Sequence, residues 1–223
     1  MTTFQQIALL LIGIWFAMIM VRFRHSTGML IAGLIVIGLF TLVSHALGKV
    51  TLVELGLRPL WLPAVGFAVV GLVISLAYSS LADKIASCWF EKPPTLDSFR
   101  AIQQSRTTLV IGIVVAWLLG GFLEELIARG IILQSVAILL KPWLPPFLAI
   151  LLAILIAAVG AGLLHSYQGP RAVAIISQIS ILFGILFVVS GYNLWAAILC
   201  HGLYDTIAFV RFANKTSRYA NVS

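Results

Sequence analysis

At the centre of the longest apolar segment stands the sequence Gly120-Gly121-Phe122-Leu123-Glu124-Glu125-Leu126-Ile127-Ala128-Arg129, which contains two carboxylates and one guanidinium. A charged side chain at the middle of a bilayer costs about 2.5–3.5 kcal/mol on insertion scales, so three within six residues need a partner or a function. On a helix, Glu125 and Arg129 share a face and can pair, whereas Glu124 points about 100° away. The two glycines precede Glu124 on its own face and leave room for water or a peptide backbone. We therefore expect the chemistry at Glu124.

The composition predicts a membrane protein. The chain has 223 residues, of which 61% are hydrophobic and 9% are charged, and its mean hydropathy is +1.11. Soluble domains carry about 25% charged residues, so we predict an all-α, polytopic transmembrane helical bundle. A transmembrane β-barrel is excluded because the apolar runs are continuous, without period-two alternation. The net charge of +7 is scattered over segment ends, which indicates membrane topology and no nucleic-acid partner.

The apolar segments predict about seven spans. They cover residues 7–21, 29–47, 61–81, 107–140, 147–164, 172–189 and 194–210. The fourth exceeds the roughly 20 residues that a bilayer requires, so we expect it to tilt, to project or to break near its glycines. In the polar stretch 83–106, Pro93-Pro94-Thr95 predicts a short surface helix near 95–105 that is capped by Thr95. Ser190-Gly191-Tyr192-Asn193 predicts a tight turn before the last span.

The distribution of Lys and Arg predicts the orientation. With the N-terminus outside and the C-terminus cytoplasmic, only Lys49, Arg58 and Lys141 fall on the outer side. The other basic residues beyond the span ends then lie inside, as the positive-inside rule requires. We expect one integral membrane domain over residues 1–223, multi-pass in the plasma membrane of a bacterium, with the first span retained as an anchor.

Three further polar side chains stand in or at the ends of apolar segments: His165, His201 and Asp205. His201 and Asp205 are four residues apart and therefore project from one face of the last helix. Isolated polar groups in lipid are costly. We expect the groups from these three helices, together with Glu124, to meet in one cavity.

The motifs Glu124-Glu125-x-x-x-Arg129, then His165, then His201-x-x-x-Asp205 resemble in order and spacing those of the CAAX protease and bacteriocin-processing (CPBP) family, which includes the type II prenyl-protein endopeptidase. Leu55-Gly56-Leu57-Arg58-Pro59 is similar to a stretch of bacterial members. The resemblance covers about half the chain, from Thr107 to Phe209, and marks residues 107–210 as a catalytic core. One departure is Ala161, where the family pattern usually has Phe.

This resemblance implies a metal-independent intramembrane glutamic endopeptidase without a cofactor. Glu124 and His165 would activate a water molecule, and His201 and Asp205 would stabilise the oxyanion. Glu125 and Arg129 would form a structural pair. The implied partners are the lipid bilayer and a membrane-associated peptide, either prenylated or a leader peptide. An ionised Asp205 cannot donate a hydrogen bond, so it would be protonated or would orient His201.

Other interpretations remain open at this point. The four residues Glu124, His165, His201 and Asp205 are acceptable zinc ligands, although no HExxH motif is present. A non-catalytic bacteriocin-immunity or membrane scaffold protein would carry the same motifs, and a transporter or proton pathway also uses intramembrane Glu and His. His201 and Asp205 also fit a purely structural contact between helices. Finally, Glu124 falls in the middle of its span and His165 at the end of its own, so a shared water requires a longer fifth helix or a fourth segment that begins at the surface.

Overall fold

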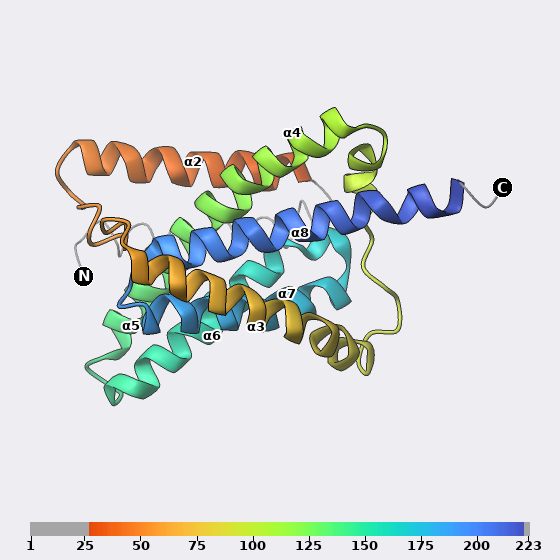
Figure 1. The fold of residues 1–223 in the computed structure, drawn as a ribbon. Coiled ribbons are helices and arrows are strands. Elements are labelled where there is room, and N and C mark those ends of the chain that lie inside the picture. The colour runs from red at the N-terminus through yellow and green to blue at the C-terminus, as the bar shows by residue number, and fades with distance from the viewer. Residues whose placement is uncertain (1–26, 221–223) are drawn as a thin grey trace.

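The computed structural model describes residues 27–220, which contain helices and no strand (Figure 1). Five separate helices frame the bundle: α2 (Thr27–Ala46), α3 (Leu62–Ser87), α6 (Pro146–Leu164), α7 (Pro170–Val189) and α8 (Leu194–Ala220). A continuous helical segment between α3 and α6 consists of α4 (Arg106–Ala116), η2 (Trp117–Glu124), η3 (Leu126–Leu133) and α5 (Gln134–Leu140). Two short 3₁₀ helices complete the fold: η1 (Asp97–Gln103) and η4 (Ser166–Gln168).

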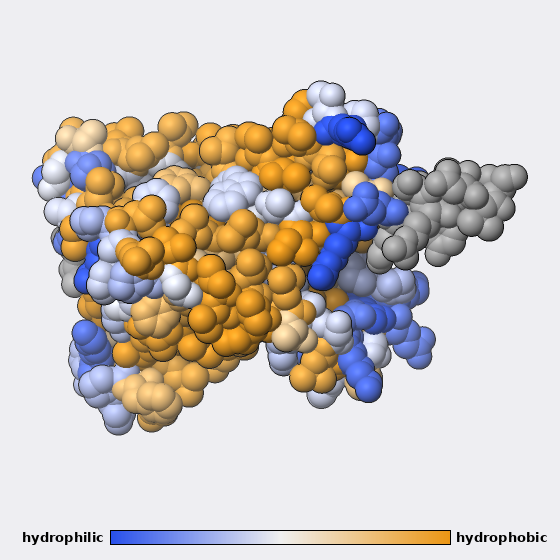
Figure 2. All heavy atoms as spheres, in the orientation of Figure 1, coloured by the Kyte–Doolittle hydropathy of each residue, from blue (hydrophilic) through white to orange (hydrophobic). Residues whose placement is uncertain are grey.

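Five of the described helices are long and apolar enough to cross a membrane: Leu62–Ser87, Arg106–Leu140, Pro146–Leu164, Pro170–Val189 and Leu194–Asn214. The stretch Ile35–Ala46 of α2 is a shorter apolar helix, and the predicted span 7–21 lies outside the described residues. Figure 2 shows a continuous apolar belt with hydrophilic residues at both ends. The prediction of a multi-pass, all-α transmembrane bundle is thus confirmed.

The long fourth segment does not break at its glycines. It runs as one helix from Arg106 to Leu140, but it widens to π-helical geometry over η2 and η3. A π-turn holds an additional residue in each hydrogen-bonded loop, so side chains rotate relative to the α-helical pattern. This widened part carries both glutamates and the arginine. π-Helical turns occur frequently at functional sites.

The predicted cap of the surface helix is wrong. The helix η1 begins after Leu96, which makes no side-chain cap hydrogen bond. The Thr95 backbone N–H instead donates to the carbonyl of Gln168 at 2.9 Å, so Thr95 ties this loop to the turn after α6. A capping box forms one helix later, where Ser105 Oγ accepts from the Thr108 N–H at 3.1 Å and starts α4.

Small residues let the helices approach closely. A Cβ on Gly121 would lie 3.3 Å from the Gly202 Cα of α8, and a Cβ on Gly162 would collide with Ser177 of α7. Such contacts drive helix association in lipid, where the hydrophobic effect between helices is absent. The predicted turn before α8 is confirmed, with Gly191 and Tyr192 both at positive φ.

The apolar core of the described residues has two clusters. The first surrounds η3 and includes Ile131, Leu133, Ala153, Phe187 and Leu194. The second lies among α3, α7 and α8, which Figure 1 shows running beside one another, and includes Ala64, Ala68, Phe183, Leu186, Ala196 and Cys200. The helices that carry the polar side chains, η2, η3 and α8, are thus fixed by packing to these clusters.

Candidate active site

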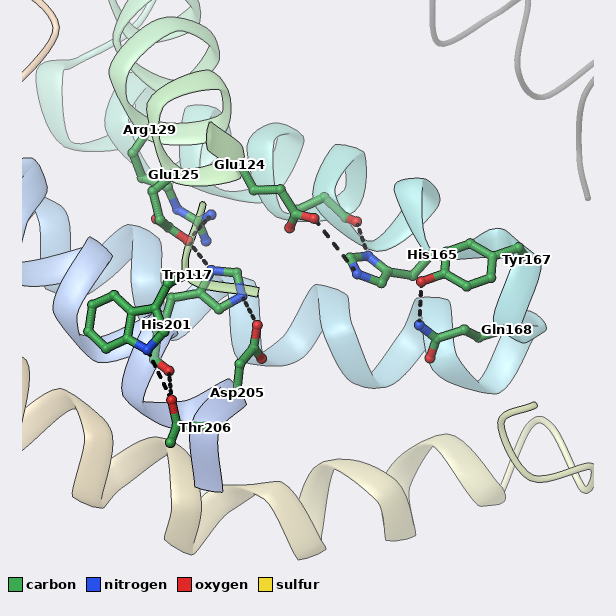
Figure 3. Close-up of polar contacts among 12 residues, drawn as sticks. Trp117, Glu124, Glu125, Arg129, His165, Tyr167, Gln168, His201, Asp205 and Thr206 are labelled. Carbon is green, nitrogen blue, oxygen red and sulfur yellow. Dashed lines mark hydrogen bonds and ion pairs between the residues drawn. The ribbon is translucent and has the colours of Figure 1, made fainter. Parts of the chain in front are cut away.

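Glu124 and His165 face each other across a short gap (Figure 3). Glu124 ends the π-helical η2, and His165 lies directly after the last residue of α6. Glu124 Oε1 is 3.9 Å from His165 Nε2, and the two side chains are 13% and 20% exposed. The separation is too long for a direct hydrogen bond. It is short enough for one water molecule to contact both groups.

The ring of His165 is oriented by its own helix. His165 Nδ1 lies 3.0 Å from the carbonyl oxygen of Ala161. Because a carbonyl only accepts, Nδ1 carries a proton and donates to it, and Nε2 is the ring nitrogen that faces Glu124. The Glu124–His165 contact also shows that the two side chains lie at the same depth in the bundle. The helix α6 ends at Leu164 without extending past His165, and the two side chains still meet at one level.

Glu125 and Arg129 form the predicted ion pair, and both are fully enclosed. Arg129 Nη1 donates to Glu125 Oε1 at 3.0 Å, and the side chains are 2% and 0% exposed. Arg129 Nη2 donates to the carbonyl and the hydroxyl of Ser180 at 2.7 and 2.6 Å, which ties η3 to α7. The Arg129 guanidinium also stands 5.7 Å over the ring of Phe183. These contacts offset part of the cost of burying the two charges, although Glu125 Oε2 and Arg129 Nε are buried without a hydrogen-bond partner among the described residues.

His201 connects this pair to Asp205. His201 Nδ1 lies 2.8 Å from Glu125 Oε1, while His201 Nε2 lies 3.5 Å from Asp205 Oδ2. Since Glu125 already accepts from Arg129 and is a carboxylate, His201 Nδ1 donates to it. The proton on Nδ1 is thereby fixed. The opposite nitrogen, Nε2, faces Asp205 and the remaining part of the site.

The two pairs belong to one polar site, as predicted. Asp205 lies within electrostatic range of Glu124 and His165 as well as His201. Tyr167, which follows His165, interacts electrostatically with both Glu124 and Asp205. Figure 3 shows these groups on the same side of the Glu125–Arg129 pair. The four residues singled out from the sequence therefore converge from η2, the end of α6, and α8.

The role expected of the two glycines needs correction. They do not leave an open patch beside Glu124. A Cβ on Gly120 would lie 2.9 Å from Asp205 Oδ2 and 3.5 Å from His201 Nε2, whereas Gly121 faces Gly202. Both glycines thus face α8 because the helix is π-helical here and rotates them away from the Glu124 direction. Gly120 makes space for the His201–Asp205 pair, and Gly121 brings the backbones together.

Residues 106–207 match the family model described as Type II CAAX prenyl endopeptidase Rce1-like. The matched segment, just under half of the chain, is similar to this Rce1-like family. No curated protein and no solved structure matches the chain in the same comparisons. The matched segment contains every side chain of the polar site, from Glu124 to Asp205. This similarity to a peptidase family of the CAAX type agrees with the apolar helices of a multi-pass membrane protein.

Within residues 27–220, no three His, Cys, Asp or Glu side chains are grouped in a way that could hold a metal ion. No residue is therefore assigned to a metal or cofactor.

Several contacts of the polar site were not predicted from the sequence. The Glu125–His201 hydrogen bond joins positions 76 residues apart. Phe183 lies against both the Arg129 guanidinium and the His201 ring, with ring centroids 5.0 Å apart in the second case. Ser180 carries no local sequence signal at all, because it looks like any small residue in a transmembrane helix. Only Tyr167 had a signal, its position two residues after His165.

Proposed function

We propose that the chain is an intramembrane glutamic endopeptidase, in which Glu124 and His165 hold and activate the attacking water. The observation that carries this proposal is the 3.9 Å gap between Glu124 Oε1 and His165 Nε2. Both atoms are hydrogen-bond acceptors when Glu124 is ionised and His165 is neutral. One water molecule that donates to both has its lone pairs directed away from them, toward a bound peptide. The match of residues 106–207 to the Rce1-like family model supports a peptide as the substrate.

The reaction balances with these groups alone. The water oxygen bonds to the peptide carbonyl carbon, and one water proton passes to the Glu124 carboxylate. The tetrahedral intermediate then collapses, the C–N bond breaks, and the proton on Glu124 passes to the leaving nitrogen. The products are a carboxylic acid and an amine. His165 keeps the water in line through Nε2, because its other nitrogen is fixed on Ala161.

His201 and Asp205 are the proposed stabilisers of the oxyanion. Glu125 accepts from His201 Nδ1 at 2.8 Å and holds the ring in place, so Nε2 points toward Asp205. An oxyanion needs a donor, and neither a carboxylate nor an unprotonated Nε2 is one. The active form of this pair therefore carries one proton between His201 Nε2 and Asp205 Oδ2. Glu125 and Arg129 act on the reaction through His201.

The finer assignments follow from the sequence and belong to the same proposal. Residues 1–223 form one integral membrane domain, with the catalytic core at 107–210. The protein resides in the plasma membrane of a bacterium with its N-terminus outside and its C-terminus in the cytoplasm. Its substrate is a membrane-associated peptide, either prenylated or a leader peptide.

The test is hydrolysis by the purified protein in detergent. Fluorogenic peptides with and without a farnesylated cysteine are incubated in EDTA and in H₂¹⁸O, and the products are read by mass spectrometry. We expect cleavage in EDTA, with one ¹⁸O in the new carboxyl group and no covalent intermediate. Activity lost in EDTA and restored by zinc would replace the glutamic mechanism with a metal one. A folded protein that cleaves none of these peptides would favour an immunity or scaffold protein.

A further inference from the structure

Tyr167 stands beside the candidate active site and has no role in the mechanism above. It belongs to η4, the single turn that follows α6, and lies between the spans that end at Leu164 and begin at Pro170. Its ring is stacked on the His165 ring, with centroids 6.0 Å apart and planes inclined by 28°. Figure 3 shows its hydroxyl on the side of the ring that faces His165.

The turn that carries Tyr167 is braced on two sides. The Thr95 N–H donates to the Gln168 carbonyl at 2.9 Å, which fastens the loop before η1 to this turn. At the start of α7, Arg171 Nε and Nη2 donate to the two oxygens of Asp83 at 2.8 Å each, and Nη1 donates to the Glu91 carbonyl. The phenol is thus held in place before any substrate arrives, which reduces the entropic cost of binding.

The Tyr167 hydroxyl has an unused donor. Gln168 Nε2 donates to Tyr167 Oη at 3.0 Å, so the phenol oxygen serves as an acceptor there. Among the described residues, no acceptor receives the Tyr167 O–H. Burial, together with the charges of Glu124 and Asp205, raises the pKa of Tyr167 above its usual value. The O–H therefore stays present across the whole working range of pH.

A peptide substrate requires such a donor. In the described bundle no strand edge is present to pair with an extended peptide. A peptide carbonyl that leaves water without gaining a new hydrogen bond weakens the binding of the peptide, because its desolvation is not compensated. A rigid phenol next to the attacked bond supplies that bond at a small cost in side-chain entropy.

We propose that the Tyr167 hydroxyl binds the substrate by donating a hydrogen bond to a peptide carbonyl oxygen adjacent to the attacked bond. This inference rests on the proposed endopeptidase function. It assigns the phenol to binding, in the ground state and the transition state alike, and leaves proton transfer to Glu124. Such uniform binding lowers KM and leaves kcat nearly unchanged.

The test is Tyr167→Phe, which removes only the hydroxyl, with Tyr78→Phe as the matched control. Tyr78 is a partly buried phenol that donates to Gln178 at 2.9 Å in another part of the bundle. For a fluorogenic peptide with a farnesylated cysteine, we expect Tyr167→Phe to raise KM about three- to tenfold. Its kcat should stay within twofold of the wild type, and Tyr78→Phe should change neither constant. An unchanged KM in Tyr167→Phe would overturn the assignment.

A second pair of variants tests the direction of the hydrogen bond. Gln168→Glu replaces the donor beside Tyr167 with a carboxylate that captures the O–H, so KM should rise as in Tyr167→Phe. Gln168→Met leaves the O–H free and should keep KM within twofold. If Gln168→Met raised KM as much as Gln168→Glu, the turn as a whole and not the free O–H would be responsible, and the proposal would fail.

The outcome separates this inference from the proposed function. Cleavage by the wild type but not by Glu124→Gln supports the endopeptidase, and the KM of Tyr167→Phe then decides the role of the phenol alone. If the wild type cleaves no peptide, the endopeptidase fails first. Equilibrium binding of the same peptide to Glu124→Gln and to Glu124→Gln/Tyr167→Phe still tests the phenol. Equal dissociation constants, or no binding to either, would refute it.

Discussion

Replacing Arg129 with Met should separate what the buried ion pair does for stability from what it does for activity. Arg129 is 2% exposed and its partner Glu125 is 0% exposed. Met preserves much of the length of the side chain, but it removes the charge and the bonds to Ser180. Glu125 then keeps only His201 as a partner, and Ser180 loses the guanidinium as a donor to its carbonyl and hydroxyl.

The expected loss is large. Removing one member of a buried ion pair destabilises a protein by about 3–5 kcal/mol, because the remaining charge stays buried. For a chain of this length each kcal/mol lowers the Tm by about 2–4 °C, so the Tm should fall by about 6–20 °C. The double variant Glu125→Leu/Arg129→Met removes both charges and should recover at least half of that loss. It should not recover activity, because His201 Nδ1 no longer has the acceptor that orients it.

The assay is thermal unfolding in detergent, followed by the fluorescence of the six tryptophans, with kcat measured on the same preparations. Arg100→Met is the matched control, since Arg100 pairs with Asp97 at the surface with 75% and 65% of the side chains exposed. Such a pair contributes about 0–1 kcal/mol, so its loss should lower the Tm by no more than about 4 °C. An Arg129→Met variant as stable as Arg100→Met would refute the reasoning, as would a double variant no more stable than the single one.

Two further predictions concern the opposite side of the site. Asp205→Asn supplies an amide donor in place of a shared proton and should keep kcat within about threefold of the wild type. Asp205→Ala should lower kcat about 10²–10³-fold, as the loss of an oxyanion donor does. Equal losses of kcat in the two variants would contradict this role. Gly120→Ala puts a Cβ 2.9 Å from Asp205 Oδ2 and should lower kcat while the Tm changes little. Gly121→Ala, with its Cβ 3.3 Å from the Gly202 backbone, should lower the Tm more than Gly120→Ala does; the reverse ranking would show that the two glycines have been assigned wrongly.

The helices and the polar constellation could be predicted because they depend on local spacing. Continuous apolar runs and proline-containing links locate the ends of α6 and α7 to within two residues. The i,i+4 relation likewise predicts both the Glu125–Arg129 and the His201–Asp205 contacts. Residue types that are costly in lipid then indicate which side chains must converge.

What was wrong or missed depends on interactions between segments. The cap expected at Thr95 is wrong because η1 begins after Leu96, one residue later. The Thr95 backbone N–H instead donates to the Gln168 carbonyl, which the fold brings close to it. The glycine face was misplaced because an α-helical period was applied to a π-helical segment. The Glu125–His201 bond and the stack of Tyr167 on His165 depend on how α6 and α8 pack against η2 and η3, which no local pattern encodes.

The measurement that tests the central claim most directly is kcat for Glu124→Gln and the wild type on one cleaved peptide in EDTA, with the Tm of both. Glutamine has the shape of glutamate but cannot take a proton from water. We predict a fall in kcat of about 10²–10⁴-fold, the usual contribution of a general base, with the Tm within about 2 °C of the wild type. A Glu124→Gln variant that is folded and retains more than a tenth of the wild-type kcat would contradict the assignment of Glu124 as the base.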